Sequence, residues 1–196
     1  MWYRIDAVDR IAEVSSDWAI TAQRSGAPEL RPATVIGRPI WSFIDGHATN
    51  FHYAQLFETV RQTKAPMQTR IRADSPSRQS LMRIEILPDE NQSLKIVTQT
   101  IRDRAIGYVG VWDRNRPRSA NLVVACSWCK AIEMGAQWLP FLDACQKRRD
   151  LLSTCPPQVV HHICPGCERA MIQERDAAFA APIPSVQRVS IPQNHK

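Results

Sequence analysis

Met67-Gln68-Thr69-Arg70-Ile71-Arg72-Ala73-Asp74 alternates apolar or small side chains with polar and basic ones. A period of two residues is typical of a β-strand with one buried and one solvated face. The same alternation returns in residues 82–86 and 94–100, and residues 88–92 between them have the composition of a turn. These three segments, joined by short connections, predict neighbouring antiparallel strands.

Upstream of this segment the sequence predicts two short strands, at residues 2–8 and 11–14, followed by helices. The clearest helix can be capped by Asn50, and its apolar residues recur at helical spacing at positions 53, 56, 57 and 60. The order is therefore two strands, several helices and three strands. It predicts an α+β fold: a five-stranded antiparallel sheet with flanking helices on one face.

Three stretches of this region carry a recognisable pattern: Val35-Ile36-Gly37-Arg38-Pro39-Ile40-Trp41-Ser42-Phe43-Ile44, Val60-Arg61 and Arg72-Ala73-Asp74-Ser75-Pro76. Together they resemble a subgroup of bacterial PAS domains over about residues 1–103. The resemblance implies a sensory domain that binds a small ligand, which the sequence does not name, or that dimerises. Relatives often have cysteine where Ala73 stands, and no cysteine precedes Cys126, which excludes the thiol photochemistry of flavin-binding relatives.

Four cysteines form two Cys-x2-Cys pairs, Cys126 with Cys129 and Cys164 with Cys167. Two thiolates two residues apart can bind one metal ion from a tight turn, and two such pairs supply the four sulfurs that tetrahedral zinc prefers. The sequence thus predicts a structural zinc site. A segment of about 50 residues buries too little apolar surface to fold alone, so it needs a metal or docking onto the first domain.

Two histidines precede the second pair. His161 could replace a cysteine as ligand or hydrogen-bond a thiolate, and His161 and His162 could equally be surface or capping residues. Four cysteine ligands are preferred because the two pairs already satisfy zinc. The other interpretations are a redox dithiol, an iron–sulfur cluster or buried thiols.

The cysteine-rich region also carries a wider pattern: Cys126-Ser127-Trp128-Cys129-Lys130, Gly135, Trp138 and His161-His162-Ile163-Cys164-Pro165-Gly166-Cys167. It resembles a module found after sensory or receiver domains in bacterial signalling proteins, which implies a signalling context. The domain prediction is a PAS-like domain at 1–103, a basic linker at 104–121, a small helical zinc-binding module at 122–177 and a disordered tail at 178–196. Helical segments are expected around 138–145 and 168–176.

Composition narrows the classes of function. The net charge is +6, with basic excess in residues 61–83 and 102–118, which we interpret as a solvated surface in preference to a nucleic-acid site. No long apolar run or signal peptide is present, so a cytoplasmic protein without membrane contact is expected. No nucleophile, phosphate loop or carboxylate pair stands at motif spacing, so no enzyme activity is expected.

The sequence as a whole predicts a non-catalytic bacterial signalling or regulatory protein. In this prediction a PAS-like domain for ligand sensing or dimerisation is coupled to an interaction module built on structural zinc. The expected partners are a signalling protein and a second copy of the chain. The alternatives are a DNA-binding transcriptional regulator and a thiol redox sensor that uses the cysteine pairs.

Overall fold

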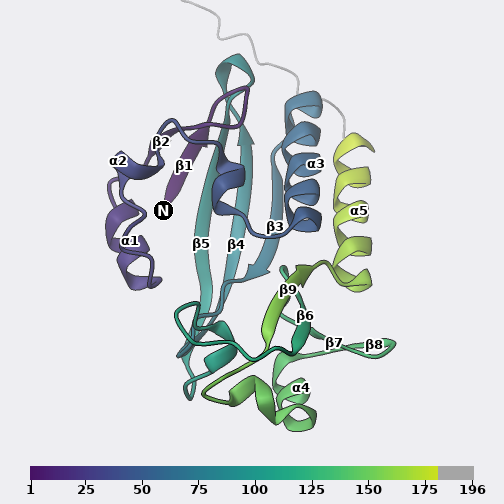
Figure 1. Ribbon diagram of the computed structural model, residues 1–196. Coiled ribbons are helices and arrows are strands. Elements are labelled where there is room, and N and C mark those ends of the chain that lie inside the picture. The colour runs from purple at the N-terminus through teal and green to yellow at the C-terminus, as the bar shows by residue number, and fades with distance from the viewer. Residues whose placement is uncertain (181–196) are drawn as a thin grey trace, which may run out of the picture.

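The computed structural model describes residues 1–180. A five-stranded antiparallel sheet has the strand order β2-β1-β5-β4-β3 (Figure 1). Its strands are β1 (Trp2–Ile5), β2 (Ile11–Val14), β3 (Met67–Arg72), β4 (Arg78–Pro88) and β5 (Leu94–Ala105). The predicted α+β class and the five-stranded antiparallel sheet are therefore confirmed.

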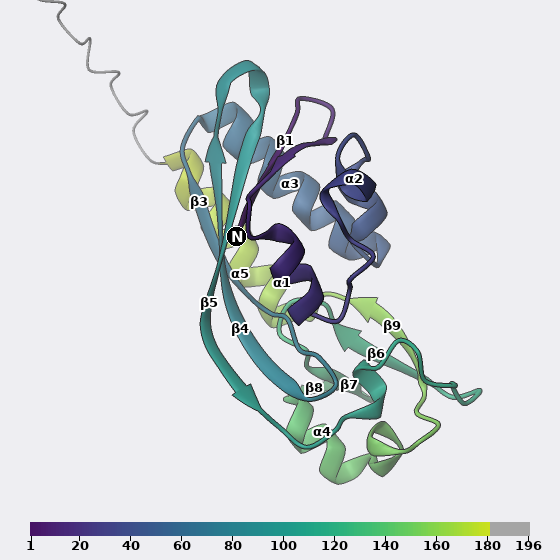
Figure 2. The same cartoon turned by 90° about the vertical axis from the view of Figure 1, so that its left-hand side faces the viewer.

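Helices between β2 and β3 lie on one side of this sheet (Figure 2). They are α1 (Trp18–Arg24), α2 (Pro32–Val35), a 3-10 turn (Ile40–Phe43) and α3 (His47–Thr63); a further 3-10 turn (Glu90–Gln92) connects β4 to β5. Helix α3 begins at His47, earlier than the Asn50 cap predicted, because Gly46 adopts a positive φ of 92° and turns the chain there.

The core of this first domain fills the space between the sheet and α3. Ile84, Ile86 and Ile96 from the sheet meet Leu56 and Phe57 from α3, and each is at most 4% exposed. The apolar stripe predicted on this helix is thus its buried face. Close packing of large side chains holds α3 on the sheet.

A second, four-stranded sheet follows, with the order β8-β7-β6-β9. Its strands are β6 (Leu122–Cys126), β7 (Ile132–Met134), β8 (Gln137–Leu139) and β9 (Gln158–His162), accompanied by α4 (Phe141–Lys147), a 3-10 turn (Arg149–Leu152) and α5 (Pro165–Ala180). The prediction of a small helical module was wrong in this respect. Trp138 and Leu139, expected in a helix, lie in β8 because Pro140 starts α4 only after them.

The segment expected to be a linker, 104–121, is packed in part. Strand β5 continues to Ala105, and a 3-10 turn follows (Gly110–Trp112). Val109 and Val111, on either side of Gly110, are buried in a second core, which they form with residues such as Phe141 and Leu151. A Cβ at Gly110 would lie 2.6 Å from the carbonyl oxygen of Ser153, so only glycine fits. Gly110, which the prediction counted toward linker composition, thus serves a close approach of two backbone segments.

Helix α5 is longer than the expected 168–176. It begins at Pro165, the first-turn position that proline favours, and runs to Ala180. Residues 178–180, assigned to the tail, therefore belong to this helix, and residues 181–196 lie outside the described residues. Helix α5 lies beside α3 and β3 (Figure 1). Among the described residues no helix combines the length and hydropathy needed to cross a membrane.

Candidate metal centre

The two cysteine pairs sit on two turns that the second sheet brings together. Cys126 is the last residue of β6, and the chain then reverses direction through Cys129 and Lys130 before it enters β7. Lys130 makes this reversal in the left-handed region, with a φ of 61°. Cys164 follows β9, and Cys167 lies in the first turn of α5. Because β6 and β9 are parallel and in register, with Cys126 opposite His162, both turns emerge at the same end of the sheet.

All four predicted ligands are brought together. The Sγ atoms of Cys126, Cys129, Cys164 and Cys167 lie within 4.8 Å of one another, and those of Cys129 and Cys164 are 3.7 Å apart. Four sulfurs around a tetrahedral zinc ion, each bonded at about 2.3 Å, would be spaced by about 3.8 Å. The cluster could therefore hold a metal ion with little rearrangement.

Backbone amides point at the sulfurs. Cys126 Sγ accepts hydrogen bonds from the N–H groups of Cys129, at 3.5 Å, and of Cys164, at 3.4 Å, and Cys164 Sγ accepts one from Cys167 N–H at 3.4 Å. Such bonds favour the thiolate over the thiol, because the donor dipoles stabilise negative charge on sulfur.

The thiols also compete for ionisation. Hydrogen bonds from the Cys129 and Cys167 thiols lower the pKa of Cys126 well below its usual value. The same hydrogen bond raises the pKa of Cys129 to about 12, and the pKa of Cys167 is raised too. One thiolate thus suppresses ionisation of its neighbours, and a cation is needed for all four sulfurs to carry charge together.

The first turn is anchored in the first domain through Trp128, which is 4% exposed. Its Nε1–H donates to Thr69 Oγ1 at 3.3 Å, its ring lies 4.9 Å from that of Tyr53, and its carbonyl accepts from Arg72 N–H at 2.7 Å. Thr49 Oγ1 also donates to Ser127 Oγ at 2.6 Å. Sequence reasoning missed this anchor. The available signal was a large apolar side chain inside a two-residue spacer, which must be buried against something outside the turn.

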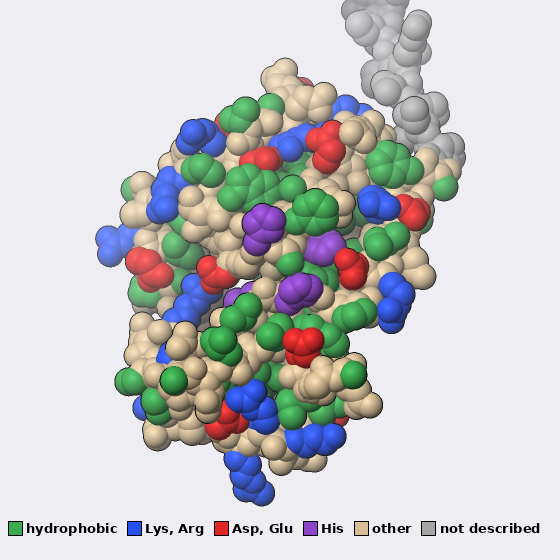
Figure 3. Space-filling view, turned by 45° about the vertical axis from the view of Figure 1, so that its right-hand side comes forward, with side chains coloured by type: hydrophobic (Ala, Val, Ile, Leu, Met, Phe, Trp, Pro, Cys, Tyr) green, Lys and Arg blue, Asp and Glu red, His purple; other side chains and the backbone are tan. Residues whose placement is uncertain are grey.

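Neither His161 nor His162 belongs to the sulfur cluster. Burial lowers the pKa of His161, whose Nδ1 is buried without a hydrogen-bond partner among the described residues. The ring Nδ1 of His162 lies 2.9 Å from the carbonyl oxygen of Ile163. Figure 3 shows histidine side chains gathered on one face of the molecule. His52 on α3 is buried, and burial lowers its pKa.

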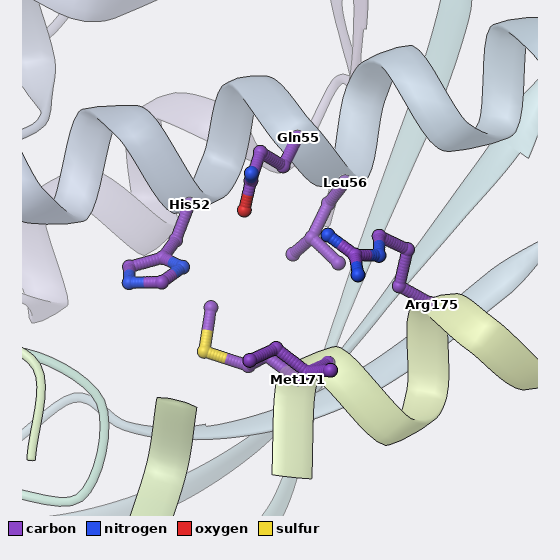
Figure 4. A pocket seen from close by; sticks show the side chains of 6 residues that line it. His52, Gln55, Leu56, Met171 and Arg175 are labelled. Carbon is purple, nitrogen blue, oxygen red and sulfur yellow. The ribbon is translucent and has the colours of Figure 1, made fainter. Parts of the chain in front are cut away.

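The seam between α3 and α5 is tightly closed around His52 and Met171. His52, Gln55 and Leu56 from α3 point toward Met171 and Arg175 from α5 (Figure 4), around a cavity of about 10 Å³. That volume holds about one water molecule. This part of the seam is therefore a packing interface and is too small for a ligand. Farther along the same two helices, Phe51 and Phe179 line an open hollow of about 440 Å³.

The two remaining cysteines lie outside the cluster. Cys145 is buried in the second core, which raises its pKa to about 11, and Cys155 is exposed in a loop. Both positions agree with the sequence prediction of a small core residue and a loop residue.

No protein-family model matches the chain, and no curated protein gives a significant match. Among solved structures it is similar to a domain of an HTR-like protein from Haloarcula marismortui ATCC 43049, with 15% sequence identity and a TM-score of 0.35. The similarity covers 52% of this chain and 96% of that domain. A likeness at this level assigns neither a family nor an activity.

Proposed function

We propose that this chain is a non-catalytic signalling or regulatory protein in which a PAS-like domain, residues 1–103, is coupled to an interaction module held by structural zinc. The observation that carries the proposal is the cluster of four Sγ atoms within 4.8 Å of one another. The PAS-like assignment is supported by the resemblance in sequence and by the order of two strands, helices and three strands in one antiparallel sheet.

Zinc fits the donor set best. Four thiolates at tetrahedral spacing suit zinc, and a site closed by four protein ligands leaves no position for a substrate, as in structural zinc sites. A zinc ion with four thiolates carries two negative charges. Lys130, whose Nζ donates to the carbonyl of Ser127 in the same turn, and Arg72 and Arg169 nearby offset that charge.

The metal would tie the two parts of the chain together. It would join the turn that holds Trp128 in the first core to the first turn of α5, which contains Cys167. Because α5 packs on α3 and β3, a shift in either element is transmitted to α5 when the metal holds its N-terminus. This coupling is the signalling step that we propose.

We assign the input to protein contact, as a homodimer or with a signalling partner, in preference to a small ligand. The space between the sheet and α3 is filled by side chains such as Phe57, Ile86 and Ile96, each 1% exposed. A ligand entering there would have to displace well-packed apolar groups, which costs several kcal/mol.

Elemental analysis of untagged protein purified without chelator tests the proposal. We expect about one zinc ion per chain, retained through gel filtration, because structural sites bind zinc with a free energy of about 10–16 kcal/mol. Iron with visible absorbance, or protein that is folded without metal, would contradict it. Gel filtration with light scattering on the same sample reports whether the chain is a dimer.

A thiol redox sensor is the second candidate, favoured by the partial exposure of Cys129 and Cys167. Both residues line open hollows, so an oxidant can reach them. Hydrogen peroxide would oxidise two of the thiols to one disulfide, with water as product, and release the metal. For this candidate we expect zinc release, followed with a chromogenic chelator, to track the loss of two thiols per chain at micromolar peroxide. An unchanged thiol count and metal content would exclude it.

A further inference from the structure

Two adjoining hollows meet at Arg72. The larger, of about 460 Å³, lies beside the cysteine cluster and is lined by Trp138, Pro140, Pro165 and Arg169 among others. The smaller, of about 220 Å³, lies over β4 and β5 and is lined by Leu81, Arg102 and Arg104 among others. Arg72 lines both hollows, and we call the two together the arginine groove.

The charge of the arginine groove is of one sign. Four arginines line it, and no aspartate or glutamate does: Arg72, Arg102, Arg104 and Arg169. Arg72 is held in place by Asp74, whose side chain is fully buried and accepts from its Nε and Nη2. Arg104 donates to the neutral amide oxygen of Gln79. Within residues 1–180, Arg102 and Arg169 have no side-chain ion pair or hydrogen bond.

The groove also has an apolar floor near the cysteine cluster. Trp138 is half-buried, and Ala131, Pro140 and Pro165 line the hollow beside it. The described residues thus place four guanidinium groups, of which Asp74 and Gln79 hold two, next to a site for one apolar side chain. This combination suits a ligand that carries several negative charges around an apolar group.

We propose that the arginine groove binds a short acidic peptide segment of a partner protein, with one aromatic or apolar side chain of that segment packed against Trp138. This deepens the proposed function by giving the chemistry of the partner, and it rests on that function only for the signalling context.

The acidic residues around the groove favour a peptide over nucleic acid. The basic surface is bounded by acids: Glu174 lines a neighbouring cavity together with Arg70, and Glu85 follows Arg83 by two residues on β4. A phosphate backbone would need a longer basic track. Charge compensation of the metal cluster explains Arg72 and Arg169 but not Arg102 and Arg104, because the smaller hollow that these two line contains no cysteine.

The test is fluorescence anisotropy with a fluorescein-labelled short peptide that has a central phenylalanine flanked by glutamates. The matched peptide has glutamine in place of every glutamate. We expect the acidic peptide to bind and the glutamine peptide not to bind. The double variant Arg102→Gln/Arg169→Gln should weaken binding of the acidic peptide by about tenfold or more, because it removes two charge-assisted contacts. The control double variant Arg24→Gln/Arg149→Gln removes the same charge from exposed arginines that do not line the groove.

Three outcomes would overturn the proposal: no binding of the acidic peptide, an equal loss in both double variants, or tighter binding by an oligothymidylate of about twelve nucleotides with the same sensitivity to Arg102→Gln/Arg169→Gln. The last would make the groove a nucleic-acid surface. Trp138→Leu should weaken the phenylalanine peptide and leave an alanine-centred peptide unaffected. Zinc content measured on every variant separates failure of this proposal from failure of the proposed function.

Discussion

Replacing Cys126 by serine is expected to abolish stoichiometric zinc binding and to release α5 from the first domain. Cys126 is completely buried and accepts two backbone N–H groups through Sγ, so its sulfur is the most enclosed of the cluster. A serine hydroxyl at this place is a poor zinc ligand and leaves a buried polar group. The lost ligand removes a large part of the about 10–16 kcal/mol that a structural zinc site contributes to folding.

Hydrogen exchange measured by mass spectrometry checks this result. Peptides from β9 and α5 should lose protection in the Cys126→Ser variant, while the sheet of the first domain should keep most of its own. Cys155→Ser is the matched control, because Cys155 is exposed and outside the cluster. Full zinc content in Cys126→Ser, or unchanged exchange in residues 165–180, would show that the cluster does not hold this helix.

Replacing Trp128 by alanine should lower the stability of the protein without loss of zinc. The four sulfur ligands are untouched, but a side chain 4% exposed is removed from between Tyr53 and Thr69. Truncating a buried tryptophan costs about 3–5 kcal/mol, because transfer energy is lost and a cavity remains. The urea midpoint should therefore drop strongly.

Trp128→Phe is the informative control for this prediction. It keeps an aromatic ring in the site and removes only the hydrogen bond from Nε1–H to Thr69, which contributes about 0.5–1.5 kcal/mol. We expect the urea midpoint of Trp128→Phe to lie between those of the wild type and Trp128→Ala. If Trp128→Ala unfolds at the same urea concentration as the wild type, the contact seen in the structure does not join the two parts.

The first sheet could be predicted because its signals are local. Alternation of apolar and polar residues along 67–74 reports one buried face of a strand, whatever its partner, and α3 carries its stripe at positions 56, 57 and 60 in the same way. The cysteine spacing is equally local, since two thiols separated by two residues reach one point from one turn. Both predictions depend only on residues that lie within a few positions of one another along the chain.

The second sheet could not be predicted, because its pairings are not local. Strand β6 pairs with β9 across more than thirty residues, and β8 is a three-residue strand whose existence depends on β7 beside it. Val109 and Val111 looked like linker residues because their neighbours are typical of loops, and only packing against Phe141 and Leu151 makes them core. Trp138 kept helical spacing with later residues, but Pro140 separates it from α4.

By itself, then, the sequence determined a five-stranded antiparallel sheet with helices and the identity of four cysteines that can share one metal ion. Tertiary structure alone decided that the cysteine cluster is continuous with the first core. Cys126, Trp128 and Cys164 are buried in one cluster with Phe57 and Ile86. The physical reason is that burial depends on which surfaces meet in space, and the residues that meet here are separated by tens of positions along the chain.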